Sequence, residues 1–127
     1  MDCKILIIDD DKIIRKVTSH MVKFCKPFSS DPLLFENGME AFNYLAMEEN
    51  KHIKYILFLD INMPILNGWA FLEKLEKEKL MHKKVIYLMT SSVDKEDHRK
   101  AINNKYIKNI ITKPITIKKI ASLLTIS

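Results

Sequence analysis

Short apolar runs recur along the chain, and they constrain its fold more than any other feature. Residues 5–8, 55–59 and 85–89 are continuous stretches of Ile, Val, Leu, Met and aromatic residues, while residues 110–111 form a shorter run and residues 33–35 a weaker one. Strands that are buried on both faces of a parallel sheet have this composition, whereas a strand with one solvated face alternates polar and apolar residues. The pattern therefore predicts five strands in a sheet that is covered on both sides.

Between these runs, apolar residues recur at helical spacing. The predicted helical stripes are Ile14, Val17, Met21 and Phe24; Phe42, Leu45 and Ala46; Phe71, Leu72 and Leu75; Ala101 and Ile102; and Ile117, Ile120, Ala121 and Leu124. Ser92 or Asp94 is placed to cap the fourth helix, and Thr116 the fifth. Strict alternation of strand and helix predicts one doubly wound α/β domain over residues 1–127, with right-handed crossovers and no separate output domain.

The only two glycines of the chain both follow asparagine, in Asn37-Gly38 and Asn67-Gly68. Asn-Gly between apolar runs is also a strong hairpin signal. Because helical spacing follows each pair, we interpret both pairs as turns that enter helices, where a glycine permits positive φ. Such scarcity of glycine excludes the glycine-rich phosphate loops of Walker and dinucleotide-binding motifs.

Charge and cysteine content exclude several classes of function. The net charge of +5 comes from scattered C-terminal lysines with few aromatic residues between them, so it does not predict nucleic-acid binding. Cys3 and Cys25 have no metal-ligand spacing, and the run 5–8 is too short for a secretory leader, so we expect a reducing cytoplasmic location. No run approaches the ~20 apolar residues of a membrane span.

Reactive side chains stand at the ends of the predicted strands. Asp9 and Asp10 follow the first run, and Asp60, Thr90 and Lys113 follow the third, fourth and fifth runs. Ligands of open α/β sheets bind beyond the carboxyl ends of the strands, so we expect these five residues to converge. Considered singly, the aspartates could mark a helix start, the threonine a strand end, and the lysine a solvated surface position.

Carboxylates that lie so close together require a counter-cation. Two like charges about 4 Å apart repel by ~4 kcal/mol at an effective dielectric of about 20. Oxygen ligands without histidine or cysteine favour Mg²⁺, which proteins usually hold with one or two carboxylates and a phosphate. Lys113 and the Thr90 hydroxyl would then contact phosphoryl oxygens, and one carboxylate would remain as a nucleophile. Asp11 is better explained as the start of the first helix.

Four motifs in one order resemble the signatures of response-regulator receiver domains. They are Lys-Ile-Leu-Ile-Ile-Asp-Asp-Asp at residues 4–11, Leu-Asp-Ile-Asn-Met-Pro-Ile-Leu-Asn-Gly at residues 59–68, Thr90-Ser91, and Thr112-Lys113-Pro114. The resemblance covers the whole chain and extends to stand-alone regulators of the chemotaxis type. It implies a flavodoxin-like (βα)5 fold with strand order 2-1-3-4-5.

The resemblance also implies a role for each acidic residue. Asp60 corresponds to the phosphoryl acceptor, which attacks the phosphohistidine of a sensor histidine kinase or histidine phosphotransfer protein. Asp10, Asp60 and the backbone carbonyl of Asn62 correspond to the Mg²⁺ ligands, and Asp9 to an acid that acts mainly through metal-bound water.

Thr90 and Lys113 correspond to the groups that contact the phosphoryl group, and the Lys113-Pro114 bond is usually cis in the family. The family usually places an aromatic switch residue three positions before this lysine, where the present chain has Ile110. The sequence leaves open whether Tyr106 takes that role from a shifted position.

The leading hypothesis is a signalling protein that catalyses only its own phosphorylation and dephosphorylation, and that acts on a downstream protein rather than on nucleic acid or a membrane. A second hypothesis is an adaptor that keeps the receiver fold and binds partners without phosphorylation. A metal-dependent phosphatase ranks last, because that chemistry needs a second acid where this chain has Asn62.

Overall fold

Five parallel strands form the centre of the protein, in the order β2-β1-β3-β4-β5. The computed structural model describes residues 3–26, 30–91 and 95–125. The strands are β1 Lys4–Ile8, β2 Leu33–Phe35, β3 Tyr55–Asp60, β4 Lys84–Thr90 and β5 Ile107–Thr112. The predicted α/β class and strand order are confirmed, and the parallel pairing excludes the hairpin interpretation of the Asn-Gly pairs.

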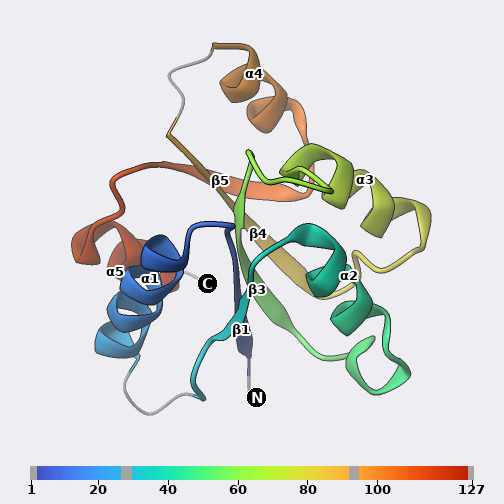
Figure 1. Ribbon diagram of the computed structural model, residues 1–127, viewed down its shortest axis with the longest axis horizontal. Helices are drawn as coiled ribbons and strands as arrows, with labels where there is room; N and C mark the ends of the chain where they lie inside the picture. Colours follow the sequence, from blue (N-terminus) through green and yellow to red (C-terminus); the bar gives the residue numbers. More distant parts are fainter. Residues whose placement is uncertain (1–2, 27–29, 92–94, 126–127) are drawn as a thin grey trace.

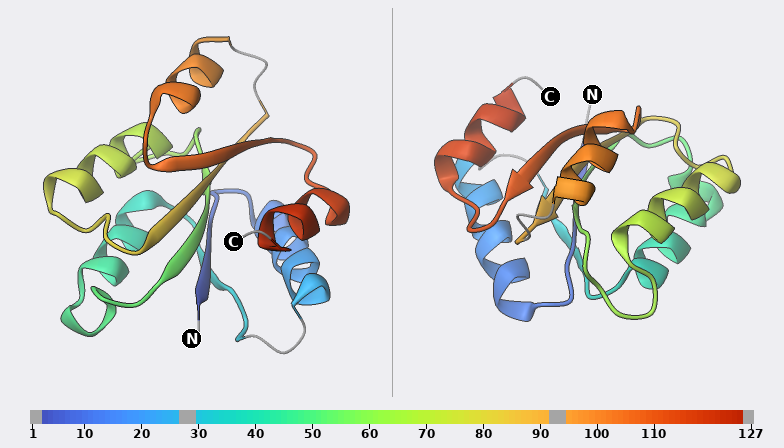
Figure 2. Two further views of the ribbon diagram at one scale, coloured as in Figure 1. Left: turned by 180° about the vertical axis from the view of Figure 1, so that it is seen from behind. Right: turned by 90° about the horizontal axis from the view of Figure 1, so that it is seen from above.

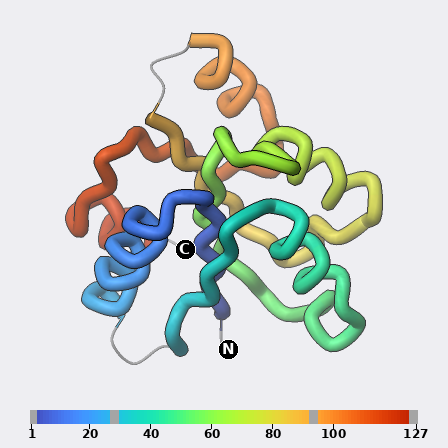
Figure 3. Tube along the Cα trace, in the orientation of Figure 1, coloured from blue at the N-terminus to red at the C-terminus, as the bar shows by residue number. Residues whose placement is uncertain are grey.

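Helices cover both faces of this sheet. They are α1 Lys12–Cys25, α2 Gly38–Ala46, α3 Gly68–Lys77, α4 Lys95–Asn103 and α5 Ile117–Thr125, with a short 3-10 turn, η1, at Glu48–Asn50. Figure 1 shows α1 and α5 side by side on one face and α2 and α3 on the other, and the view from above in Figure 2 separates these layers. The trace in Figure 3 shows α4 standing off from the sheet. None of the helices within the described ranges is long and apolar enough to cross a membrane.

Successive side chains of β1 and β3 enter two different cores because neighbouring residues of a strand point to opposite faces. Leu6 and Ile8 pack under α2 and α3, whereas Ile5 and Ile7 pack under α1 and α5. All six residues of β3 are buried. Burial of each such aliphatic side chain contributes roughly 1.5 to 3 kcal/mol, which explains why the central strands are nearly uninterrupted apolar runs.

The apolar stripe predicted for the first helix is partly wrong. Thr18 and Val22 are the buried residues of α1, while Val17 is 43% and Phe24 is 72% exposed. Because α1 carries apolar residues on two of its faces, the spacing alone could not decide which one meets the sheet. Ile102 of α4 is also exposed, at 81%, although its neighbour Ala101 is buried as expected.

Side-chain caps fix several helix starts. Asp11 accepts hydrogen bonds from the amides of Ile13 and Ile14, which confirms it as the start of α1. Thr116 accepts a hydrogen bond from the amide of Lys119 at 3.2 Å, as predicted for the fifth helix. The proposed caps of the fourth helix, Ser92 and Asp94, lie outside the described residues.

The two Asn-Gly pairs do enter helices, with asparagine as the capping residue and glycine as the first helical residue. The expectation of positive φ is wrong, since neither Gly38 nor Gly68 adopts it. Close approach of neighbouring backbone, described below for Gly68, explains the glycine instead.

Candidate functional site

Three carboxylates meet where β1 and β3 end. These strands are neighbours, with Ile8 opposite Leu59, so Asp9 and Asp10 come to lie beside Asp60. One carboxylate oxygen from each of the three aspartates lies within 4.8 Å of the others. Asp9 and Asp60 are buried, at 0% and 4% exposure, whereas Asp10 is open to solvent.

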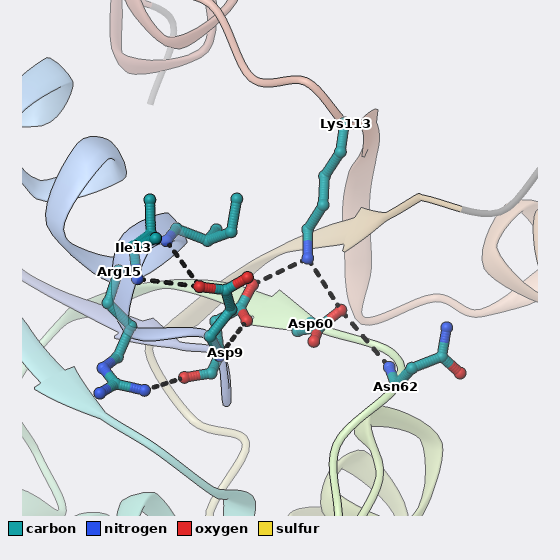
Figure 4. A network of polar contacts seen from close by, with 8 residues as sticks. Asp9, Ile13, Arg15, Asp60, Asn62 and Lys113 are labelled. Atoms are coloured by element: carbon teal, nitrogen blue, oxygen red, sulfur yellow. Dashed lines mark hydrogen bonds and ion pairs between the residues drawn. The ribbon is translucent and has the colours of Figure 1, made fainter.

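Lys113, which follows the edge strand β5, brings a positive charge into this cluster. Its Nζ lies 2.9 Å from Oδ2 of Asp9 and 3.4 Å from Oδ1 of Asp60, as Figure 4 shows. The residue follows β5, and the Lys113-Pro114 peptide bond is cis, as the resemblance implied. The amide of Lys113 donates to the carbonyl of Thr90 at 2.8 Å, which joins the ends of β4 and β5.

The electrostatics of the site are dominated by burial and by the closeness of the two acids. Burial, together with the negative charge of Asp9, raises the pKa of Asp60 to about 6, although Lys113 and the amide of Asn62 oppose the change. Burial alone would lower the pKa of Lys113, but its hydrogen bond to Asp9 and the charges of both aspartates raise it. Lys113 therefore stays protonated, and Asp60 is charged only above about pH 6.

The residues present fit a magnesium ion. Asp9, Asp10 and Asp60 carry three negative charges and Lys113 one positive charge, which leaves two negative charges for a divalent cation to balance. Every side-chain donor in the cluster is a carboxylate oxygen, the ligand type that Mg²⁺ prefers.

The remaining predicted residues, Thr90 and Asn62, lie at the end of β4 and just beyond the end of β3. Thr90 is the last residue of β4, and it is fully buried. Asn62 is exposed, and its amide donates to Oδ1 of Asp60 at 3.4 Å. The roles assigned to the Thr90 hydroxyl and to the Asn62 carbonyl stay predictions.

Arg15 is a supporting residue that the sequence reasoning missed. Its guanidinium Nη1 donates to the backbone carbonyl of Asp9 at 2.7 Å, and the amide of Asp11 donates to Oδ1 of Asp9 at 2.9 Å. With Lys113 on Oδ2, these contacts hold Asp9 at three points (Figure 4). The signal available in the sequence was an arginine in the first turn of α1, four residues after the last aspartate of the run.

Gly68 packs directly against the backbone of Asp60 and Ile61. Its amide donates to the carbonyl of Ile61 at 2.8 Å. A Cβ at this position would lie 2.7 Å from the carbonyl oxygen of Asp60 and 2.9 Å from Cα of Ile61. Only glycine allows the start of α3 to pack this closely against the backbone of Asp60.

The structure also places Ile110 and Tyr106, the two residues considered for the aromatic switch. Ile110 is partly buried against the core under α2 and α3. The Tyr106 side chain lies beside Glu76 of α3, and its interaction with that carboxylate raises the pKa of the tyrosine. The Tyr106 side chain therefore lies beside α3, next to Glu76.

Comparisons with known proteins agree with this architecture. A family model described as the response regulator receiver domain matches residues 5–125. A chemotaxis protein CheY homolog of Campylobacter jejuni is 29% identical over 113 residues, covering 89% of this chain and 82% of that protein.

Two solved structures share the fold. The crystal structure of a two component response regulator from Cytophaga hutchinsonii matches with a TM-score of 0.84 and 24% identity, over 98% of this chain and 95% of that one. Vibrio cholerae chemotaxis protein CheY4 matches with a TM-score of 0.77 and 20% identity, over 98% of both chains. The family model spans nearly the whole chain, and Asp9, Asp10 and Asp60 of this protein meet at one edge of the sheet. The protein therefore belongs to the response-regulator receiver domain family, whose members are typically signalling switches rather than enzymes.

Proposed function

We propose that this protein is a single-domain, cytoplasmic response regulator that accepts a phosphoryl group on Asp60 from the phosphohistidine of a sensor kinase or phosphotransfer protein. The observation that supports this most strongly is the meeting of Asp9, Asp10 and Asp60 around the ammonium of Lys113. Without a cation to balance it, such a cluster costs folding free energy, because carboxylates held this close repel each other.

In the proposed reaction, a carboxylate oxygen of Asp60 attacks phosphorus. A P–O bond forms as the N–P bond of the phosphohistidine breaks, and the electron pair of that bond returns to the imidazole nitrogen. With a pKa of about 6, Asp60 is mostly ionised at neutral pH and is more basic than an ordinary aspartate, which favours nucleophilic attack.

The other site residues would stabilise the charge that the phosphoryl group brings. Lys113 is within reach of Asp60 and would transfer its contact to a phosphoryl oxygen, where the Thr90 hydroxyl would act as a second donor. Asp9, Asp10, Asp60 and the Asn62 carbonyl would hold Mg²⁺. When bound, Mg²⁺ would neutralise charge between the carboxylates and the phosphoryl oxygens.

Phosphorylated Asp60 would signal through a protein partner or pass the phosphoryl group to another histidine. Exposed lysines of β5 and α5, namely Lys108, Lys118 and Lys119, favour a partner with an acidic surface. We assign no turnover of a separate substrate, no nucleic-acid target and no membrane target.

Incubation with Mg²⁺ and acetyl phosphate, followed by intact-mass measurement, tests the proposal. We expect wild type and Asp31→Asn, which alters an exposed aspartate outside the site, to gain one phosphoryl group, and Asp60→Asn to gain none. Equal labelling of the Asp60→Asn protein, or no labelling of wild type, would contradict the proposal.

The adaptor hypothesis keeps one supporting observation, the aliphatic Ile110 at the usual position of the aromatic switch. If it is correct, Asp60→Ala will bind the partner as tightly as wild type does, with or without acetyl phosphate. Loss of phosphorylation-dependent binding in that variant would rule the adaptor out.

A further inference from the structure

Helix α4 has little apolar anchorage in the rest of the protein. Ala101 is its buried residue, and the larger Ile102 is 81% exposed. The helix stands away from the sheet in Figures 1 and 2. Because one buried alanine removes little apolar surface from water, hydrophobic burial holds α4 only weakly, and polar contacts have a large share in fixing its position.

Trp69, in the first turn of α3, makes two such contacts with α4. Its indole Nε1 donates a hydrogen bond to Oδ1 of Asp97 at 3.1 Å. The Nζ of Lys100 lies 5.3 Å from the centroid of the indole ring, within the range of a cation–π interaction. Asp97 and Lys100 are three residues apart, so they project from the same face of α4. The two charged side chains therefore engage the edge and the ring of one indole.

Trp69 is also connected to the backbone of Asp60, through the preceding residue Gly68. Gly68 precedes it in the chain, and a Cβ on Gly68 would lie only 2.7 Å from the carbonyl oxygen of Asp60. The amide of Gly68 also donates to Ile61 at 2.8 Å. Protein interiors are close-packed, so there is no free space between Gly68 and the backbone of Asp60 and Ile61. A shift of that backbone must therefore displace the first turn of α3.

We propose that Trp69 couples the acidic site to helix α4. A change at Asp60 moves Gly68 and Trp69, and the contacts of the indole with Asp97 and Lys100 transmit that movement to α4. This inference rests on the proposed phosphorylation of Asp60, and it names how that event reaches the surface. Tyr106 is not part of this route, because neither of the two contacts between Trp69 and α4 involves it.

Trp69 is the single tryptophan of the chain, so its fluorescence reports on this contact directly. The experiment adds Mg²⁺ and beryllofluoride, a phosphoryl mimic, and records Trp69 emission together with amide hydrogen exchange of residues 95–103. Wild type should respond in both measurements. Asp97→Ala should lose at least half of each response, and its α4 amides should exchange roughly tenfold faster without the mimic.

Glu96→Ala is the matched control, because it removes the same charge from the neighbouring position of α4, where Glu96 pairs with Arg99 instead of Trp69. It should retain the full response. Trp69→Phe keeps an aromatic ring but lacks the N–H donor, and it should lose the α4 exchange response. Since coupling is reciprocal, Asp97→Ala should also change the affinity for the mimic by about fivefold or more, in contrast to Glu96→Ala.

A full response in Asp97→Ala, or equal loss in Glu96→Ala, would overturn the coupling role of Trp69. Acetyl phosphate labelling of the same samples separates this failure from that of the proposed function. If wild type takes up a phosphoryl group while Asp97→Ala responds normally, only the coupling inference fails. If wild type takes up none, the proposed function fails and the inference falls with it.

Discussion

Replacing Asp60 with asparagine removes a buried negative charge and keeps the shape of the side chain. Asp60 is 4% exposed, and burial with the adjacent Asp9 raises its pKa from 3.8 to about 6. Each pKa unit corresponds to 1.36 kcal/mol, so ionised Asp60 lowers the free energy of unfolding by about 3 kcal/mol. We therefore expect Asp60→Asn to be more stable than wild type at neutral pH by about that amount.

The pH dependence has a definite sign. The folded protein binds the Asp60 proton more tightly than the unfolded chain does, so wild type loses stability as the pH rises from about 4 to about 6. Above that window the loss is complete, and below it Asp60 is neutral in both states. The stability gap between wild type and Asp60→Asn should therefore be close to zero near pH 4 and largest above about pH 7.

Urea denaturation at a series of pH values measures this gap, because other titrating groups are shared by both proteins and cancel in the difference. With a slope of 1 to 3 kcal/mol/M, a gap of about 3 kcal/mol moves the midpoint by roughly 1 to 3 M. Mg²⁺ should stabilise wild type more than the variant and so narrow the gap. A gap of equal size at both ends of the pH range, or a wild type that is the more stable protein at neutral pH, would refute this account of the site.

Three further predictions concern the surroundings of Asp60. Asp10→Ala should weaken the stabilisation by Mg²⁺ and change the stability of the metal-free protein little. Asp11→Ala should lower the free energy of unfolding by ~1 kcal/mol through loss of the α1 cap, and should leave the effect of Mg²⁺ intact. Thermal melting with and without Mg²⁺ measures both variants. Gly68→Ala should cost about 1 to 3 kcal/mol in urea denaturation and slow acetyl phosphate labelling, because its Cβ would meet the Asp60 carbonyl at 2.7 Å. Ile65→Asn should stabilise the protein by about 1 kcal/mol, since Ile65 is β-branched, 78% exposed and held at a φ of 70°; unchanged stability would argue against strain in this loop.

Much of the fold could be predicted from the sequence because strands buried on both faces leave a strong local signal. Each predicted run lies within an observed strand, although the run at residues 110–111 is only part of β5, which spans Ile107–Thr112. Lys108 and Asn109 in that edge strand are exposed, so the apolar pattern could not mark its start. Helix faces were less predictable. In α1, packing against the sheet and α5 buried Thr18 and Val22 and left Val17 and Phe24 accessible.

By itself, the sequence determined which residues end the strands, and with them the acidic site. Parallel strands bring their carboxyl ends to one edge, so Asp9, Asp10 and Asp60 had to meet once the strand order was known. Only the tertiary structure decided the contacts between elements distant in the chain. Lys113 pairs with Asp9 across 104 positions, Gly68 closes on the Asp60 carbonyl, and Trp69 bonds to Asp97 of α4. These contacts depend on packing geometry and side-chain direction, which no local pattern of residues records.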